Sequence, residues 1–181
     1  TKIKEDMMGW DMKSGLDAAT GQILAVIDGD GQMPPEDVAR VYKKMKEEKL
    51  DLAKTYRAKR HDSYYRTCIS KVYNLLFKVL FPGLECEDIN SKPKVMTRGV
   101  YGQLELKSNG WFIDAEIMIQ ARRLGLKVAE VPTVFHGIES RASFIKPTSI
   151  LEFSANLIWY RILEFRYGFI KTGFINSEQK E

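Results

Sequence analysis

Two aspartates and a glutamine recur at every second position just after an apolar run. Asp28, Asp30 and Gln32 alternate with glycines and follow the run 23–27. Side chains on extended backbone alternate, so these three can point the same way, and the glycines leave room for a ligand. Their oxygens suit a hard divalent cation such as Mg²⁺ or Mn²⁺, which commonly takes its remaining ligands from phosphates. The spacing therefore indicates a metal site that binds a diphosphate, most naturally a nucleotide diphosphate.

Two other interpretations of this stretch compete with the metal site. The same residue types occur in an acidic turn between a strand and a helix, and this alternative stays open. A calcium loop of the EF-hand type needs glycine at its sixth position and glutamate at its twelfth. The chain has Met33 and Ala39 at those positions, which excludes the calcium loop.

The surrounding sequence predicts an α/β fold that places this stretch at a ligand site. The segment 22–27 is apolar and rich in β-branched residues, which favours a buried central strand. The prolines that follow suit the first turn of a helix over 36–48. Ligands of open α/β sheets bind beyond the carboxyl ends of strands, where these carboxylates lie. Further predicted elements are strands at 50–56 and 127–132, a short strand within 85–96, helices at 6–20 and 97–107, and helices ending near 81 and 124.

The composition is that of one domain in a reducing compartment. The chain has 181 residues, 44% hydrophobic and 29% charged, which is enough for one α/β core. The net charge of +4 fits an anionic ligand or a membrane surface and requires neither. Cys68 and Cys86 predict free thiols, not a disulfide framework or a metal cluster. The sequence shows no signal peptide and no apolar run that could span a bilayer, so we expect a cytoplasmic location.

A second set of polar residues suits a phosphate. Residues 57–66 are predicted as a basic loop leading into a helix, on which Arg66, Ser70 and Asn74 lie four residues apart. A guanidinium and a hydroxyl on one helix face would hold a phosphate well. A solvated helix face is the equal alternative, and the residues alone leave it open. The stripe of this helix predicted to face the core is Ile69, Val72, Leu76 and Val79 or Leu80.

Two later segments carry further candidate residues. Asp114 and Glu116 lie near the start of a predicted helix, where they either favour the helix dipole or face the acceptor. The segment 137–146 is rich in small and polar residues and holds Arg141 and Ser143. We predict a mobile loop there, and such loops often carry function.

The C-terminal segment 147–171 is predicted to be a mostly apolar helix. Charged residues spread around it, which makes it too polar to span a bilayer. It suits a helix that packs on the domain, lies at a membrane interface or joins a partner. Residues 172–181 are predicted to be a disordered tail.

Taken in their order along the chain, these motifs resemble those of family 2 glycosyltransferases of the GT-A fold. The resemblance is strongest to the polyprenyl-phosphate branch, typified by dolichol-phosphate mannose synthase, and covers about residues 11–166. The segments that carry it are 15–21, Asp28–Gln32, Pro35-Glu36, Asp88, Trp111–Glu116, Val128–Pro132 and Arg141–Ser143. No single motif is specific to the family, since D-x-D alone is common. The order and spacing of the motifs together are specific.

The resemblance implies a role for each site. Asp28, Asp30 and Gln32 would bind Mg²⁺ or Mn²⁺ together with the donor diphosphate, and Asp30 would be catalytic. The other implied residues are Arg57, Arg66 and Ser70 for the acceptor lipid phosphate, Arg141 and Ser143 near the phosphates, Asp88 after the long helix, and Asp114 (catalytic) and Glu116 at the acceptor side.

The chain departs from the family pattern in three places. Lys92-Pro93-Lys94 stands where many members have Gly-Phe, and the loop 57–66 is short. The first strand and the upstream segment that holds the nucleotide base are missing. We therefore expect residues 1–146 to be the C-terminal part of an N-terminally truncated GT-A catalytic domain, with a mixed sheet flanked by helices, from a longer enzyme.

The predicted function is a metal-dependent, inverting transfer of a mannose- or glucose-type sugar from a nucleotide-diphosphate sugar to a polyprenyl or dolichyl phosphate, by an enzyme peripheral to the membrane. With a sugar hydroxyl as acceptor, Asp114 or Glu116 would instead act as a base. A non-catalytic module that binds a membrane surface or a partner is the third possibility. We expect no nucleic-acid binding, because the basic residues form no recognisable module with exposed aromatics.

Overall fold

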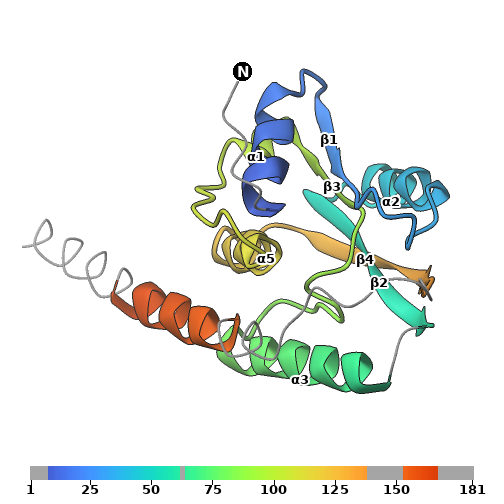
Figure 1. Cartoon of the computed structure of the whole chain (residues 1–181). Coiled ribbons are helices and arrows are strands. Elements are labelled where there is room, and N and C mark those ends of the chain that lie inside the picture. Colours follow the sequence, from blue (N-terminus) through green and yellow to red (C-terminus); the bar gives the residue numbers. More distant parts are fainter. Residues whose placement is uncertain (1–7, 62–63, 138–152, 167–181) are drawn as a thin grey trace, which may run out of the picture.

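The computed structural model describes residues 8–61, 64–137 and 153–166. Strands and helices interleave along the chain, as predicted (Figure 1). The elements are α1 (Met8–Ala18), β1 (Ile23–Val26), α2 (Glu36–Glu47), β2 (Leu52–Arg60), α3 (Tyr64–Leu80), β3 (Lys94–Thr97), α4 (Arg98–Tyr101), α5 (Ile113–Arg123) and β4 (Val128–Phe135). Residues 153–166 form a further helix.

The strands form one mixed sheet in the order β1-β3-β2-β4. β3 runs antiparallel to β1 and β2, whereas β2 and β4 are parallel, so the carboxyl ends of β1, β2 and β4 share one edge. Near that edge the register aligns Val26, Lys94, Lys54 and Glu130 in one row. The predicted mixed sheet is confirmed. The prediction of β1 as a buried central strand is wrong, because β1 is an edge strand of the described sheet and Ala25 is exposed.

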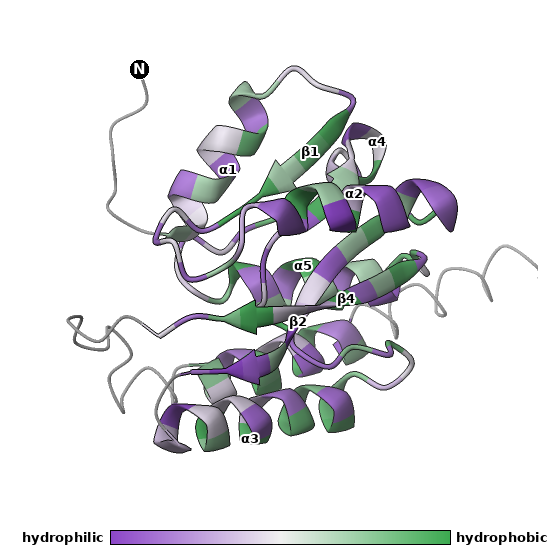
Figure 2. Cartoon of the chain, turned by 90° about the vertical axis from the view of Figure 1, so that its right-hand side faces the viewer, coloured by the Kyte–Doolittle hydropathy of each residue, from purple (hydrophilic) through white to green (hydrophobic). Residues whose placement is uncertain are grey.

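Helices cover both faces of the sheet (Figures 1 and 2). On one face, α2 packs Val41 and Met45 against the strands. On the other face, α1, α3 and α5 share a larger core, which Leu157 of the helix 153–166 joins. α5 is central to that core, because nine of its eleven residues are buried. This burial fixes the position of Asp114 in the first turn of α5.

Two element boundaries differ from the prediction. β2 continues to Arg60, so the first half of the predicted basic loop 57–66 is strand and pairs with β4. The helix predicted at 97–107 ends after one turn, as α4. Beyond it, the backbone amides of residues 105, 107 and 108 donate to the side chains of Gln120 and Glu116 on α5, at 2.8–2.9 Å. Tertiary hydrogen bonds thus override the local helical pattern.

α3 presents its predicted stripe to the core only in part, because Leu76 and Leu80 pack against the core whereas Val72 and Val79 do not. Its buried residues are Tyr73 and Phe77, whereas Val72 and Val79 are exposed. Large aromatic side chains bury the most area, and here they decide the orientation. Phe77 packs on Phe81 with 5.2 Å between ring centroids. The other predicted core residues, Ile69, Leu76 and Leu80, are half-buried.

The C-terminal segment is helical over 153–166, within the predicted range 147–171. Among the charged residues that interrupt it, Glu164 forms ion pairs with Arg161 at 2.5 Å and with Arg122 of α5 at 2.8 Å. Among the described residues, the structure contains no helix with the length and apolarity needed to cross a membrane. The predicted disordered tail lies outside the described residues.

Candidate active site

Asp30 and Gln32 are held in a turn just past β1. Asp30 Oδ1 accepts a hydrogen bond from Gln32 N at 3.1 Å, and Gly31 between them has a φ of 72°, which favours glycine. Gln32 also pairs with the residue after β4. Its carbonyl accepts from His136 N at 2.9 Å, and its Nε2 donates to His136 O at 3.1 Å. The turn therefore reaches across the carboxyl-end edge of the sheet, where the sequence predicted it.

The side chains of this turn fit a divalent cation whose coordination a diphosphate completes. Asp28 keeps 40% of its side chain exposed. The amide nitrogen of Gln32 binds His136, so the amide oxygen is the atom that can face a cation. In the part of the chain that the structure describes, no three His, Cys, Asp or Glu side chains gather as a metal centre. One or two carboxylates are nevertheless the usual protein share of a Mg²⁺ site completed by phosphates and water.

Lys92 connects this turn to the start of α5. Its ammonium lies 3.1 Å from Asp28 Oδ1 and 2.9 Å from Asp114 Oδ2. Lys94 binds the other oxygen of Asp114 at 2.5 Å. Lys92, Lys94 and Asp114 are all buried. Sequence reasoning assigned no function to the two lysines, and their only signal was the departure from the family's Gly-Phe pair.

Burial and charge oppose each other in this cluster. Burial alone would raise the pKa of Asp114, but the two ammonium groups hold it below its ordinary value. Burial alone would lower the pKa of Lys92, but Asp114 and Asp28 raise it. For Lys94 burial prevails and lowers the pKa to about 8. Asp114 is therefore an ionised carboxylate with both oxygens bonded, which makes it a weak proton acceptor.

Arg57 and Asp88, both predicted site residues, form a bidentate ion pair at the carboxyl end of β2. Arg57 donates to the carboxylate from Nε at 2.5 Å, from a terminal nitrogen at 2.7 Å and from its backbone N at 3.3 Å. Burial alone would raise the pKa of Asp88, but Arg57, with Lys54 and Arg60, holds it well below its usual range. The pair fixes the direction of the guanidinium.

We expect Asp88→Asn to flatten the dependence of stability on pH in acid. The native pKa of Asp88 lies below the ordinary value of 3.8. The ionised group therefore stabilises the fold above that pH, and this contribution is lost as the pH falls through and below it. Urea unfolding between pH about 6 and about 2 measures the free energy of unfolding. The control Glu47→Gln, on the exposed side of α2, should keep the wild-type slope. A wild-type slope in Asp88→Asn would contradict the expectation.

Arg66 and Ser70 lie half-buried on the first turns of α3. Their polar stripe continues to Asn74, whose Oδ1 accepts from Ile89 N at 3.0 Å. The stripe thus contacts the segment that carries Asp88. Phosphate binding by this stripe stays a prediction.

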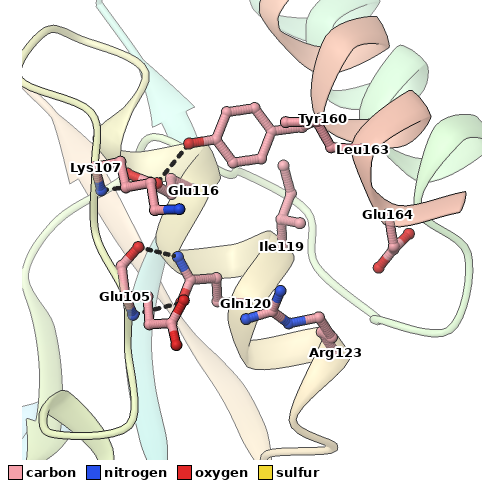
Figure 3. Close-up of a pocket in the computed structure, with 9 residues that line it drawn as sticks. All are labelled: Glu105, Lys107, Glu116, Ile119, Gln120, Arg123, Tyr160, Leu163 and Glu164. Atoms are coloured by element: carbon pink, nitrogen blue, oxygen red, sulfur yellow. Dashed lines mark hydrogen bonds between the residues drawn. The ribbon is translucent and has the colours of Figure 1, made fainter. Parts of the chain in front are cut away.

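Glu116 faces a different part of the molecule from Asp114. It accepts hydrogen bonds from the amides of residues 107 and 108 and from Tyr160 Oη at 2.5 Å, beside a cavity of about 90 Å³ (Figure 3). These contacts hold the preceding loop and the helix 153–166 against α5, and they give no support to a role at the acceptor. Arg141 and Ser143, the remaining predicted site residues, lie outside the described residues.

Comparison with known sequences agrees with this geometry. A sequence model described as "Glycosyl transferase family 2" matches residues 4–87, which include the turn Asp28–Gln32 and Arg57, Arg66 and Ser70. Over these residues the chain is similar to that family. The undecaprenyl-phosphate 4-deoxy-4-formamido-L-arabinose transferase of Serratia proteamaculans is 34% identical over 65 residues, which are 36% of this chain and 20% of that protein. The enzyme of the same name from Salmonella paratyphi B is 35% identical over 65 residues. The match thus spans only about a fifth of the length of these glycosyltransferases.

Solved structures share the fold of this chain. Glucosyl-3-phosphoglycerate synthase from Mycobacterium tuberculosis, in complex with UDP, has a TM-score of 0.66 at 20% identity, over 87% of this chain and 54% of that one. Its complex with Mn²⁺, UDP and glucosyl-3-phosphoglycerate has a TM-score of 0.65 at 21% identity, over 91% and 56% of the two chains. The predicted GT-A arrangement, a mixed sheet flanked by helices, is confirmed.

Proposed function

We propose that the protein transfers a sugar, of the mannose or glucose type, from a nucleotide-diphosphate sugar to a polyprenyl or dolichyl phosphate, with inversion at the sugar carbon. One observation carries the proposal: the oxygen-bearing turn follows β1, Arg57 lies in the second half of β2, and Arg66 lies on the first turn of α3, which follows β2. Because β1 and β2 run in the same direction, these residues lie toward the same edge of the sheet. The turn suits the donor diphosphate, and the guanidinium groups suit an acceptor phosphate. The relatives named as undecaprenyl-phosphate sugar transferases support an acceptor of this kind.

In the proposed site, Asp28, Asp30 and the amide oxygen of Gln32 would hold Mg²⁺ or Mn²⁺. The bound cation would offset the negative charge that develops on the leaving diphosphate. Solved neighbours with Mn²⁺ or Mg²⁺ and UDP support a cation of this type. Lys92 binds Asp28 through Oδ1, which leaves Oδ2 to face the ligand.

The acceptor is proposed to be a phosphate because the described residues of the site include no well-placed base. A phosphate monoester has a second pKa of about 6, so it is ionised near neutral pH and can attack unaided. A sugar hydroxyl would need Asp114 or Glu116 as a base. Both carboxylates already accept hydrogen bonds, Asp114 from the buried ammonium groups of Lys92 and Lys94 and Glu116 from the backbone amides of residues 107 and 108. In the proposal Asp114 is a positioning residue that acts through Lys92 on Asp28.

The test is sugar transfer to a short polyprenyl phosphate in the presence of Mn²⁺. A panel of uridine and guanosine diphosphate sugars, with a 4-amino-arabinose-type donor included, would identify the sugar. We expect transfer by the protein made from its full reading frame. Absence of both transfer and Mn²⁺-dependent donor binding would overturn the proposal and favour a non-catalytic module that binds a membrane or a partner.

Arg66→Ala should weaken acceptor binding selectively. We expect KM for the polyprenyl phosphate to rise ~10-fold or more, because the variant loses a charge-assisted hydrogen bond to the phosphate. The affinity for the donor should stay unchanged. Steady-state kinetics at varied acceptor concentration measure the effect. Lys43→Ala, on the exposed side of α2, is the control for a general change in charge. An unchanged KM in Arg66→Ala would remove Arg66 from the acceptor site.

A further inference from the structure

The outer face of α3 is apolar and exposed. Val72, Leu75 and Val79 are 66%, 62% and 69% exposed, and Tyr65 lies on the same face near the start of the helix. In both views α3 is the lowest element of the ribbon, with no described element beneath it (Figures 1 and 2). Isolated exposed apolar side chains are ordinary, but a contiguous stripe along a helix marks an interaction surface.

The charged residues of α3 indicate which kind of partner this face could bind. α3 contains Arg66, Lys71 and Lys78 and no acidic residue. Over residues 57–81 the sequence has six lysines and arginines against one aspartate. On the helix, Lys71 and Lys78 flank one side of the apolar stripe, and Lys78 reaches Glu87 at 3.0 Å. An apolar face edged by basic residues is the pattern of a helix that lies in the headgroup region of an anionic bilayer.

A neighbouring helix also carries exposed apolar residues. The helix 153–166 packs beside α3, with the rings of Tyr73 and Phe153 6.0 Å apart. Its own exposed apolar residues are Ile158, Trp159, Ile162 and Phe165. Tryptophan is enriched at membrane–water interfaces, where its amphipathic ring is favoured.

We propose that the outer face of α3, formed by Tyr65, Val72, Leu75 and Val79, lies on the surface of an anionic membrane. A second copy of this chain is a poorer occupant, because a symmetric contact would bring two basic surfaces together. A bilayer instead offers anionic headgroups to the lysines and acyl chains to the apolar stripe. The proposal names the surface that serves the proposed function. It rests on that function for one point, which is that a lipid phosphate at headgroup depth would lie near Arg66.

Flotation with lipid vesicles tests this proposal directly. The probes are vesicles of phosphatidylcholine alone and of equal parts phosphatidylglycerol and phosphatidylcholine. We expect the protein to bind the anionic vesicles, and less tightly as salt rises. The triple variant Val72→Ser, Leu75→Ser, Val79→Ser should bind them ~10-fold or more weakly, because less apolar surface enters the headgroup region. Tyr42→Ser, an exposed aromatic on α2, is the matched control and should bind like the wild type.

Three results would overturn the proposal. One is no binding of the wild type to anionic vesicles, and another is equal binding by the triple variant. The third is a dimer in solution that the triple variant dissociates, since this would make the face a contact between copies. Transfer to a short acceptor in detergent separates the two proposals. The triple variant should keep this transfer activity. If the wild type bound anionic vesicles but transferred no sugar, the proposed function would be wrong and the proposed membrane surface would stand.

Discussion

Asp30→Asn should abolish sugar transfer together with Mn²⁺-dependent donor binding. The variant replaces one of the two carboxylates, Asp28 and Asp30, that are proposed to bind the cation. Asp30 also orders the turn, because its side chain accepts a hydrogen bond from Gln32 N. Loss of the cation removes the charge that offsets the leaving diphosphate, so we expect turnover to fall ~10³-fold or more. The measurements are initial rates and donor affinity, each with and without Mn²⁺.

The controls for Asp30→Asn separate metal loss from misfolding. Asp11→Asn, on the exposed side of α1, is the same chemical change away from the site and should keep full activity. Both variants should unfold at the wild-type temperature, because Asp11 is exposed and Asp30, within the part of the chain that the structure describes, accepts a hydrogen bond only inside the turn. If Asp30→Asn kept the wild-type affinity for the donor and Mn²⁺, the turn would be the acidic turn that the sequence left open.

Asp114→Ala should unfold or severely destabilise the protein. Asp114 is the shared partner of two buried lysines, at 2.9 and 2.5 Å. Removing it leaves buried ammonium groups with too few acceptors, and breaking such a pair costs about 3–5 kcal/mol of the free energy of unfolding. Chemical denaturation followed by circular dichroism measures the loss.

A compensated variant tests whether that loss comes from the orphaned charges. The triple variant Lys92→Met, Lys94→Met, Asp114→Leu replaces the buried charges with apolar side chains of similar volume. Such a replacement is often neutral for the free energy of unfolding. We expect it to recover most of the stability that Asp114→Ala loses. A stable, folded Asp114→Ala protein that binds donor but does not turn over would instead mark Asp114 as a base for a hydroxyl acceptor.

Local patterns predicted the parts of the site that the chain builds locally. Asp28, Asp30 and Gln32 were found from alternation after a strand, and the sheet edge followed from strand direction. The cluster around Asp114 was missed because Lys92 and Lys94 come from another segment, and only the folded sheet brings them to α5. Nothing in local spacing shows that two lysines will be buried.

The difference between local and long-range interactions also explains the errors in the predicted fold. The helical spacing of α3 is correct, but Val72 and Tyr73 compete for the core, and only packing against Phe153 and Phe81 favours the aromatic side. The helix predicted at 97–107 has a local helical pattern, yet its later amides find side-chain acceptors on α5. In both cases a long-range contact decides between alternatives that local propensity leaves nearly equal.

The double hydrogen bond between Gln32 and His136 links two sequence segments about a hundred residues apart. A donor that restrains Gln32 also restrains His136, which precedes Arg141 by five residues. Linkage is reciprocal, so any group that immobilises the chain after β4 raises donor affinity by the same factor. Occupancy of the proposed donor site and the position of His136 at the end of β4 are therefore thermodynamically coupled through one pair of residues.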